Sequence, residues 1–175
     1  MMTLILGGAA SGKSCYAESL VLRLQGERIY IATMQPCDAE SRTRIAKHRQ
    51  LRAHKRFATL ECATALEGAA VPNGANVLLE CMSNLVANEL YDPLGAGDTA
   101  VQAVLQGVEQ LLCVCANLTI VTNEVFSGGA DYTGDTQHYL WQLAAVNRAL
   151  AQRADVVVEV VAGLANVLKG GEMLP

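Results

Sequence analysis

The sequence has few aromatic residues, few charges and no long apolar run. Of its 175 residues, 5% are aromatic, 17% are charged and 51% are hydrophobic. This balance excludes a disordered chain and is typical of a compact α/β domain with aliphatic strands. Because no run of about 18 apolar residues is present, we expect no transmembrane helix. At this length we expect one domain over residues 1–175, able to bury a core without disulfides or metal.

The sequence also has no excess of basic residues. The formal net charge is −4 and the isoelectric point is near 5.3. Nucleic acids and membrane surfaces are bound by basic patches, so we expect no nucleic-acid partner and only local phosphate binding. The first apolar segment ends at Gly7 and has no basic segment before it, which is unlike a signal sequence. We expect a cytoplasmic protein.

The cysteines form no Cys-x-x-Cys pair, so the spacing typical of a metal site is absent. They fall in segments with helix or strand patterns, where cysteine usually acts as a small buried apolar residue. We expect reduced thiols, as in a cytosolic protein. The six are Cys15, Cys37, Cys62, Cys81, Cys113 and Cys115.

Apolar segments with strand character alternate along the chain with segments of helical periodicity. This alternation predicts an α/β fold, with a largely parallel sheet covered by helices on both faces. The predicted strands are 3–6, 28–32, 57–61, 76–80, 118–122 and 156–161. The predicted helices are 13–25, 39–52, 82–90, 99–115 and 136–153.

The most specific motif is Gly-Gly-Ala-Ala-Ser-Gly-Lys-Ser at residues 7–14, directly after the first predicted strand. It matches the P-loop pattern in its strand–loop–helix context. In such a loop the backbone N–H groups point at phosphate oxygens, the Lys13 ammonium reaches the β- and γ-phosphates, and the Ser14 hydroxyl ligates Mg²⁺. We therefore predict that a nucleoside triphosphate is bound here. The alternative is a glycine-rich turn without a ligand. The predicted binding residues are Gly7, Gly8, Ala9, Ala10, Ser11, Gly12, Lys13 and Ser14.

Polar side chains follow several predicted strands, at the edge where parallel sheets bind ligands. They are Thr33, Glu61, Glu80, Asn123 and Glu124. Glu80 stands where P-loop proteins keep the carboxylate that positions Mg²⁺, so we predict that Ser14 and Glu80 form the metal site. The alternative for Glu80, and more so for Glu124, is an acid that caps a neighbouring helix or faces water.

One predicted helix is strongly basic and contains a histidine. His48 shares a helix face with Arg44 and Arg52, and Lys47 and Arg49 adjoin it. Such a face would hold a second anionic group, and a neutral imidazole there could attack a phosphorus atom to form a phosphoramidate. A solvated basic helix with an incidental histidine is the alternative, and the spacing alone does not decide between them.

Several blocks in a fixed order carry a resemblance to a known family. After the P-loop these are Tyr-Ile-Ala-Thr at 30–33, Arg-Ile-x-x-His-Arg-x-x-Arg at 44–52, Thr-x-Glu at 59–61, Leu-Glu-Cys at 79–81 and Val-Thr-Asn-Glu-Val at 121–125. Together they resemble the bifunctional adenosylcobinamide kinase/adenosylcobinamide-phosphate guanylyltransferase family of cobalamin biosynthesis. The likeness runs through essentially the whole chain.

This resemblance implies a P-loop NTPase, RecA-like α/β fold and a homotrimer. It implies phosphorylation of adenosylcobinamide by a nucleoside triphosphate, GTP or ATP, with Mg²⁺. It then implies transfer of GMP from GTP, through a guanylyl-histidine, to adenosylcobinamide phosphate, giving adenosylcobinamide-GDP. By position, His48 matches the guanylylated, catalytic histidine. Further positions that match nucleotide contacts are Ala32, Thr33, Met34, Arg49, Gln50, Leu51, Arg52, Glu61 and Glu80.

The chain departs from the family pattern at two places. Ala10 stands where the P-loop of the family usually carries Arg, and the segment after Val125 lacks the usual Pro and basic residues. Two other functions remain open from the residues alone. One is a P-loop small-molecule kinase, in which the His48 helix is only a lid or a phosphate clamp. The other is a nucleotide-dependent switch or assembly protein, although the Asn-Lys-x-Asp motif of signalling GTPases is absent.

Overall fold

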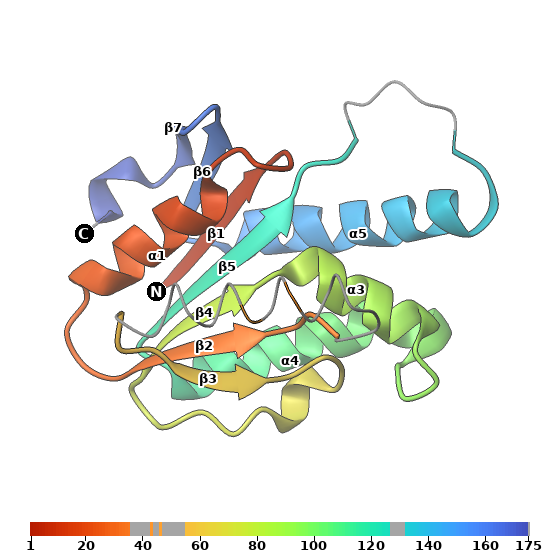
Figure 1. Ribbon diagram of the computed structural model, residues 1–175, viewed down its shortest axis with the longest axis horizontal. Helices are drawn as coiled ribbons and strands as arrows, with labels where there is room; N and C mark the ends of the chain where they lie inside the picture. Colours follow the sequence, from red (N-terminus) through yellow and green to blue (C-terminus); the bar gives the residue numbers. More distant parts are fainter. Residues whose placement is uncertain (36–42, 44–45, 47–54, 127–131, 175) are drawn as a thin grey trace.

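The computed structural model describes residues 1–35, 43, 46, 55–126 and 132–174 (Figure 1). This part of the chain forms one sheet with the strand order β3-β2-β4-β5-β1-β6-β7. Strands β1 to β6 pair in parallel, and β7 pairs antiparallel with β6. The predicted, largely parallel sheet is confirmed. The strands are β1 Met2–Gly7, β2 Arg28–Ala32, β3 Ala58–Glu61, β4 Asn76–Glu80, β5 Asn117–Asn123, β6 Val156–Val161 and β7 Leu164–Lys169.

Helices cover both faces of the sheet, as predicted. Helix α1 (Lys13–Arg23) lies on one face, and α3 (Met82–Tyr91), α4 (Ala100–Val114) and α5 (Gly134–Arg153) pack together on the other (Figure 1). Short 3-10 turns are η1 (Leu66–Gly68), η2 (Gly97–Thr99) and η3 (Gly171–Met173). The helix predicted at 39–52 falls almost entirely outside the described residues. Among the helices that are described, none is both long and apolar enough to cross a membrane.

Two cores follow from the strand alternation, because successive side chains of a strand point to opposite faces. Leu4 of β1 packs under α3, α4 and α5, whereas its neighbour Ile5 packs under α1. Helix α4 buries Val104, Val108 and Leu111 at helical spacing, which fixes the face that it turns to the sheet.

Strand β7 was not predicted. Its turn consists of Ala162 at φ 50° and Gly163 at φ 81°, between the paired residues Val161 and Leu164. Positive φ at both turn residues is typical of a two-residue hairpin. All six side chains of β7 are exposed, so the strand lacks the buried aliphatic pattern by which the other strands were found.

The expectation that the cysteines are buried was wrong for Cys15 and Cys113, which are both exposed. Cys15 lies on α1 between the buried residues Lys13 and Ala17, and Cys113 lies on α4 beyond its last buried residue, Leu111. Cys62, Cys81 and Cys115 are partly buried, and all five described cysteines are free thiols.

Glu89 of α3 is a buried carboxylate that fixes two loops. It is 2% exposed, and it accepts hydrogen bonds from the N–H of Ala65 at 2.6 Å and of Ala96 at 2.9 Å. Replacement by Ala is expected to lower the free energy of unfolding by about 3 kcal/mol, because both donors lose a charged acceptor. Glu89→Gln keeps one acceptor and should lose less. Urea denaturation measures both, and a loss below about 0.5 kcal/mol for Glu89→Ala would contradict this role.

Candidate active site

The loop between β1 and α1 has a backbone suited to an anion. Ala10 at φ 56° and Gly12 at φ 93° are left-handed, and the N–H of Ser11 donates to the carbonyl of Gly8 at 3.3 Å. Glycine is required at Gly7, because a Cβ there would lie 2.5 Å from the carbonyl oxygen of Val160. The loop runs directly into the N-terminus of α1, where the helix dipole is positive.

Lys13 and Ser11 are the polar side chains of this loop that fit a phosphate best. Lys13 is 8% exposed, and its Nζ donates to the carbonyl of Gly8 at 3.0 Å. Burial lowers the pKa of Lys13, while Cys81 and Glu80 act in the opposite direction. The Ser11 Oγ is buried and has no hydrogen-bond partner within the described part of the chain. A phosphate group would accept a hydrogen bond from the Ser11 hydroxyl and offset the desolvation of Lys13, so both residues fit a bound nucleotide.

Glu80, at the end of β4, contacts the first turn of α1. The Ser14 Oγ donates a hydrogen bond to Glu80 Oε1 at 2.5 Å, and the Tyr30 hydroxyl donates to Glu80 Oε2 at 3.0 Å. The two residues predicted as the metal site therefore lie together. Sequence reasoning assigned no role to Tyr30, which belongs to a strand with the ordinary pattern of a buried strand.

The Ser14–Glu80 pair fits a magnesium ion that arrives with a nucleotide. The described residues contain no cluster of three His, Cys, Asp or Glu side chains that would hold a metal alone. Mg²⁺ in nucleotide sites normally takes one or two protein oxygens and fills its other positions with phosphates and water. A hydroxyl and a carboxylate at hydrogen-bond distance provide that number.

Thr33 connects the ends of β2 and β4. Its side chain is fully buried, and its Oγ1 accepts from the N–H of Cys81 at 2.8 Å and donates to the carbonyl of Cys81 at 2.9 Å. Ala32 and Met34, on either side, are partly buried. These hydrogen bonds give Thr33 a structural role at the ends of two strands. Its contact with a nucleotide stays a prediction.

The other acids differ in their surroundings. Glu61 and Glu80 both pair in register with Ala32, from opposite sides of β2, and Glu61 is exposed. The carboxylate of Glu124 accepts from the N–H of Phe126 at 3.1 Å, and the side chain of Asn123 donates to Ser83 Oγ at 2.7 Å. Glu80 is hydrogen-bonded to the P-loop segment through its side chain, whereas Glu124 is bonded to it through its backbone N–H, which donates to the carbonyl of Gly7 at 3.0 Å.

The basic segment with the predicted catalytic histidine lies outside the described residues. Its predicted site residues are Arg44, His48, Arg49, Gln50, Leu51 and Arg52. The chain that follows it is fixed against the α1 face of the sheet. Lys55 forms an ion pair with Glu18 of α1, and the ring of Phe57 packs edge-on against Tyr30 at 6.2 Å between centroids.

The β6–β7 turn supports the phosphate-binding loop. The N–H of Gly163 donates to the carbonyl of Ser11 at 2.8 Å. A Cβ on Gly12 would lie 3.3 Å from the Cα of Gly163, so the two backbones are in close contact. The loop is therefore held by an element from the far end of the chain.

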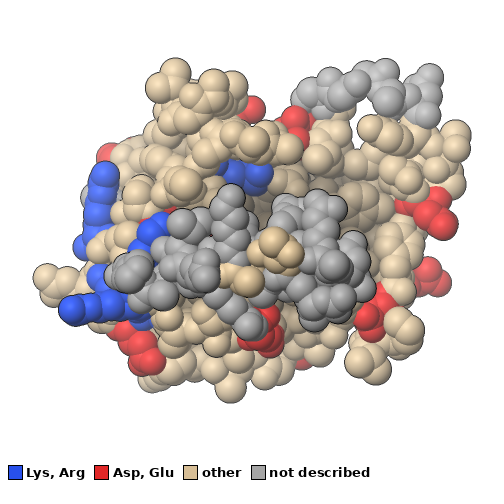
Figure 2. All heavy atoms as spheres, viewed as in Figure 1, with Lys and Arg blue, Asp and Glu red and all other residues tan. Residues whose placement is uncertain are grey.

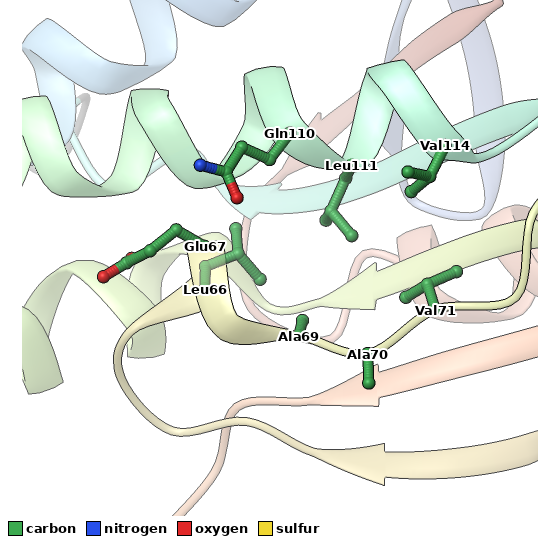
Figure 3. Close-up of a pocket in the computed structure, with 8 residues that line it drawn as sticks. All are labelled: Leu66, Glu67, Ala69, Ala70, Val71, Gln110, Leu111 and Val114. Carbon is green, nitrogen blue, oxygen red and sulfur yellow. The ribbon is translucent and has the colours of Figure 1, made fainter.

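Two surface features lie away from these contacts. On the viewed face, most Lys and Arg side chains gather at the side that carries α1, and Asp and Glu side chains are spread around the whole face (Figure 2). A pocket between η1 and α4 is lined by apolar residues such as Leu66, Val71 and Leu111 (Figure 3). No predicted site residue lines this pocket, so it is separate from the candidate active site.

A largely parallel sheet, a glycine-rich loop with a buried lysine, and the Ser14–Glu80 pair define the P-loop NTPase fold of the RecA-like class. A solved ATPase from the type III secretion system of pathogenic bacteria shares the fold, with a TM-score of 0.51 and 11% identity. That match covers 95% of this chain and 56% of that ATPase, so the chain spans about half its length. The family model for cobinamide kinase / cobinamide phosphate guanyltransferase matches residues 3–168. The chain belongs to this family.

Curated relatives match this sequence over nearly the whole chain. Two proteins named bifunctional adenosylcobalamin biosynthesis protein CobU are similar. One, from Escherichia coli (strain K12), is 34% identical, and the other, from Salmonella typhimurium (strain LT2), is 35% identical; each match covers 97% of this chain and all of the relative. The protein CobP of the same description from Pseudomonas aeruginosa is 35% identical over 97% of this chain and 98% of its own length. These matches favour the family function over a switch protein.

Proposed function

We propose that this chain catalyses two successive steps of cobalamin biosynthesis, phosphorylation of adenosylcobinamide and guanylylation of the product. The observation that carries this proposal is the phosphate-binding loop, with Lys13 bonded to Gly8 and Ser14 bonded to Glu80, within a member of this family. The test is to supply adenosylcobinamide, GTP and Mg²⁺ to the purified protein and to identify adenosylcobinamide-GDP by mass spectrometry. Absence of both the phosphorylated and the guanylylated product would refute the proposal.

In the first step the hydroxyl of the aminopropanol arm attacks the γ-phosphorus of GTP or ATP. A new P–O bond forms, the bond from the γ-phosphorus to the bridging oxygen breaks, the nucleoside diphosphate leaves and the hydroxyl proton is released. We assign the phosphate chain to residues 7–14 and Mg²⁺ to Ser14 and Glu80. Lys13 and the N-terminus of α1 stabilise the charge on the phosphoryl oxygens.

In the second step an imidazole nitrogen of His48 attacks the α-phosphorus of GTP. A P–N bond forms and the α–β bridging bond breaks, which releases pyrophosphate. A phosphate oxygen of adenosylcobinamide phosphate then attacks the same phosphorus, so the P–N bond breaks and adenosylcobinamide-GDP leaves. We assign Arg49, Gln50, Leu51, Arg52 and Glu61 to the guanine nucleotide, together with Ala32, Thr33 and Met34, on the family resemblance.

We also propose that residues 1–175 act as a single domain, that three copies assemble and that the enzyme works in the cytoplasm. The family resemblance supports the trimer, and the free thiols of the described cysteines suit a reducing compartment. Light scattering coupled to size-exclusion chromatography measures the assembly directly.

The kinase step is expected to be much slower than guanylyl transfer. Ala10 replaces the usual Arg, and the segment after Val125 has few basic residues, so less positive charge is available to hold the transferring phosphoryl group. Loss of one such clamp can cost a phosphoryl-transfer enzyme about 10³-fold in rate. The measurement is the initial rate with adenosylcobinamide and, separately, with adenosylcobinamide phosphate.

Equal rates would contradict that expectation and would show that another basic group holds the phosphate. Arg148 would then be the first residue to replace, because it is exposed on α5. Arg153, on the same helix, is already paired with Glu109.

A further inference from the structure

Glu80 is held from two sides by hydroxyl groups. Ser14 of α1 donates to Oε1 at 2.5 Å, and Tyr30 of β2 donates to Oε2 at 3.0 Å. Each carboxylate oxygen therefore has its own donor, and the two donors come from different elements of the fold.

The sheet register explains how Tyr30 reaches the metal site. Tyr30 pairs with Leu78 of β4, and Glu80 lies two residues further on, so its side chain is on the same face of the sheet. Tyr30 is 3% exposed beneath α1, and the edge contact with Phe57 fixes its ring. The hydroxyl is thus directed along the strand toward the carboxylate.

A glutamate at this position needs such a contact more than an aspartate would. Its side chain has one more rotatable bond, so its carboxylate can adopt more orientations. Ser14 has one hydroxyl proton and two lone pairs. When the proton is directed to Glu80 Oε1, the lone pairs of Ser14 are left for a cation. A donor on Oε2 that holds the carboxylate also holds Ser14 in this orientation.

We propose that Tyr30 is a positioning residue of the magnesium site, and that it sets how strongly Mg²⁺ increases nucleotide affinity. The proposal rests on the proposed function, because the cation arrives with the nucleoside triphosphate. Tyr30 acts through Glu80 and does not itself touch the nucleotide.

The test compares Tyr30→Phe with Tyr139→Phe. Tyr139 is a matched control, because its hydroxyl is also partly buried but donates to the carbonyl of Ser83 at 3.2 Å. The ligand is GTP with an α,β-methylene bridge, which cannot transfer GMP, titrated by calorimetry in Mg²⁺ and in EDTA. For Tyr30→Phe we expect the nucleotide affinity measured in EDTA to stay within about twofold of the parent. The factor by which Mg²⁺ increases that affinity should fall about tenfold, which is the scale of one hydrogen bond to a charged group. Tyr139→Phe should change neither value, and thermal melting checks the fold of both.

A double-mutant cycle separates positioning from general damage. In a Glu80→Gln background, Tyr30→Phe should cause no further loss of the Mg²⁺ effect, because both changes act through one carboxylate. Additive losses, an unchanged Mg²⁺ effect, or an equal loss in EDTA and in Mg²⁺ would each overturn the role of Tyr30. Failure of the proposed function is distinguishable, because it is measured as the absence of phosphorylated and guanylylated cobinamide, whereas the role of Tyr30 is measured from nucleotide binding alone.

Discussion

Replacement of His48 by Ala is expected to abolish the transfer of GMP from GTP to the protein. The parent protein, incubated with GTP and Mg²⁺, should gain one GMP in a linkage that is labile in acid and stable in base, as a phosphoramidate is. Without the imidazole there is no nucleophile for the α-phosphorus, so we expect no labelling and no adenosylcobinamide-GDP. Mass spectrometry of the intact protein measures the label.

The kinase step should survive in His48→Ala, because it requires only the P-loop side of the site. His54→Ala and His138→Ala are the matched controls, and both should be labelled as the parent is. Labelling that persists in His48→Ala, or a parent protein that takes no label, removes the guanylyltransferase assignment.

Lys13→Ala should have the second largest effect, a loss of at least about 10²-fold in every reaction that uses a bound triphosphate. Lys13 is a buried residue whose Nζ donates to the carbonyl of Gly8, so its charge is held at the loop, and alanine would remove this cation from beside the phosphates. Steady-state rates and nucleotide titrations measure the loss. Lys55→Ala is a suitable control, because Lys55 pairs with Glu18 outside the loop. Normal turnover by Lys13→Ala would show that residues 7–14 do not hold the nucleotide.

The parts of the fold that sequence reasoning predicted are those with local signals. Strands β2, β4 and β6 have the predicted bounds, because each is a short aliphatic run between turn residues. Strand β7 escaped prediction because its side chains are exposed. The exposure of Cys15 was missed because helical periodicity predicts which face is buried only from clearly apolar or polar residues. Cysteine is small and occurs on either face.

The candidate site divides in the same way. Residues 7–14 form a continuous motif, and Glu80 is found from its place at the end of a strand. The contact between Tyr30 and Glu80 joins residues fifty positions apart and depends on the register of β2 with β4. No pattern within either segment encodes that register. The same holds for Thr33, whose bonds to Cys81 follow from the alignment of two strand ends.

The support of the phosphate-binding loop by the β6–β7 turn has a consequence for synthesis on the ribosome. The first strand pairs with β5 and β6, so Met2 meets Leu118 and Thr3 meets Val156, and the loop after it is closed by Gly163. These partners leave the ribosome well after the loop does. The emerging chain thus contains the phosphate-binding loop before the strands and the turn that hold its conformation have been synthesised. Nucleotide can stabilise the folded loop only after Gly163 has been synthesised, so the nucleotide site depends in part on a contact between residues far apart in the chain.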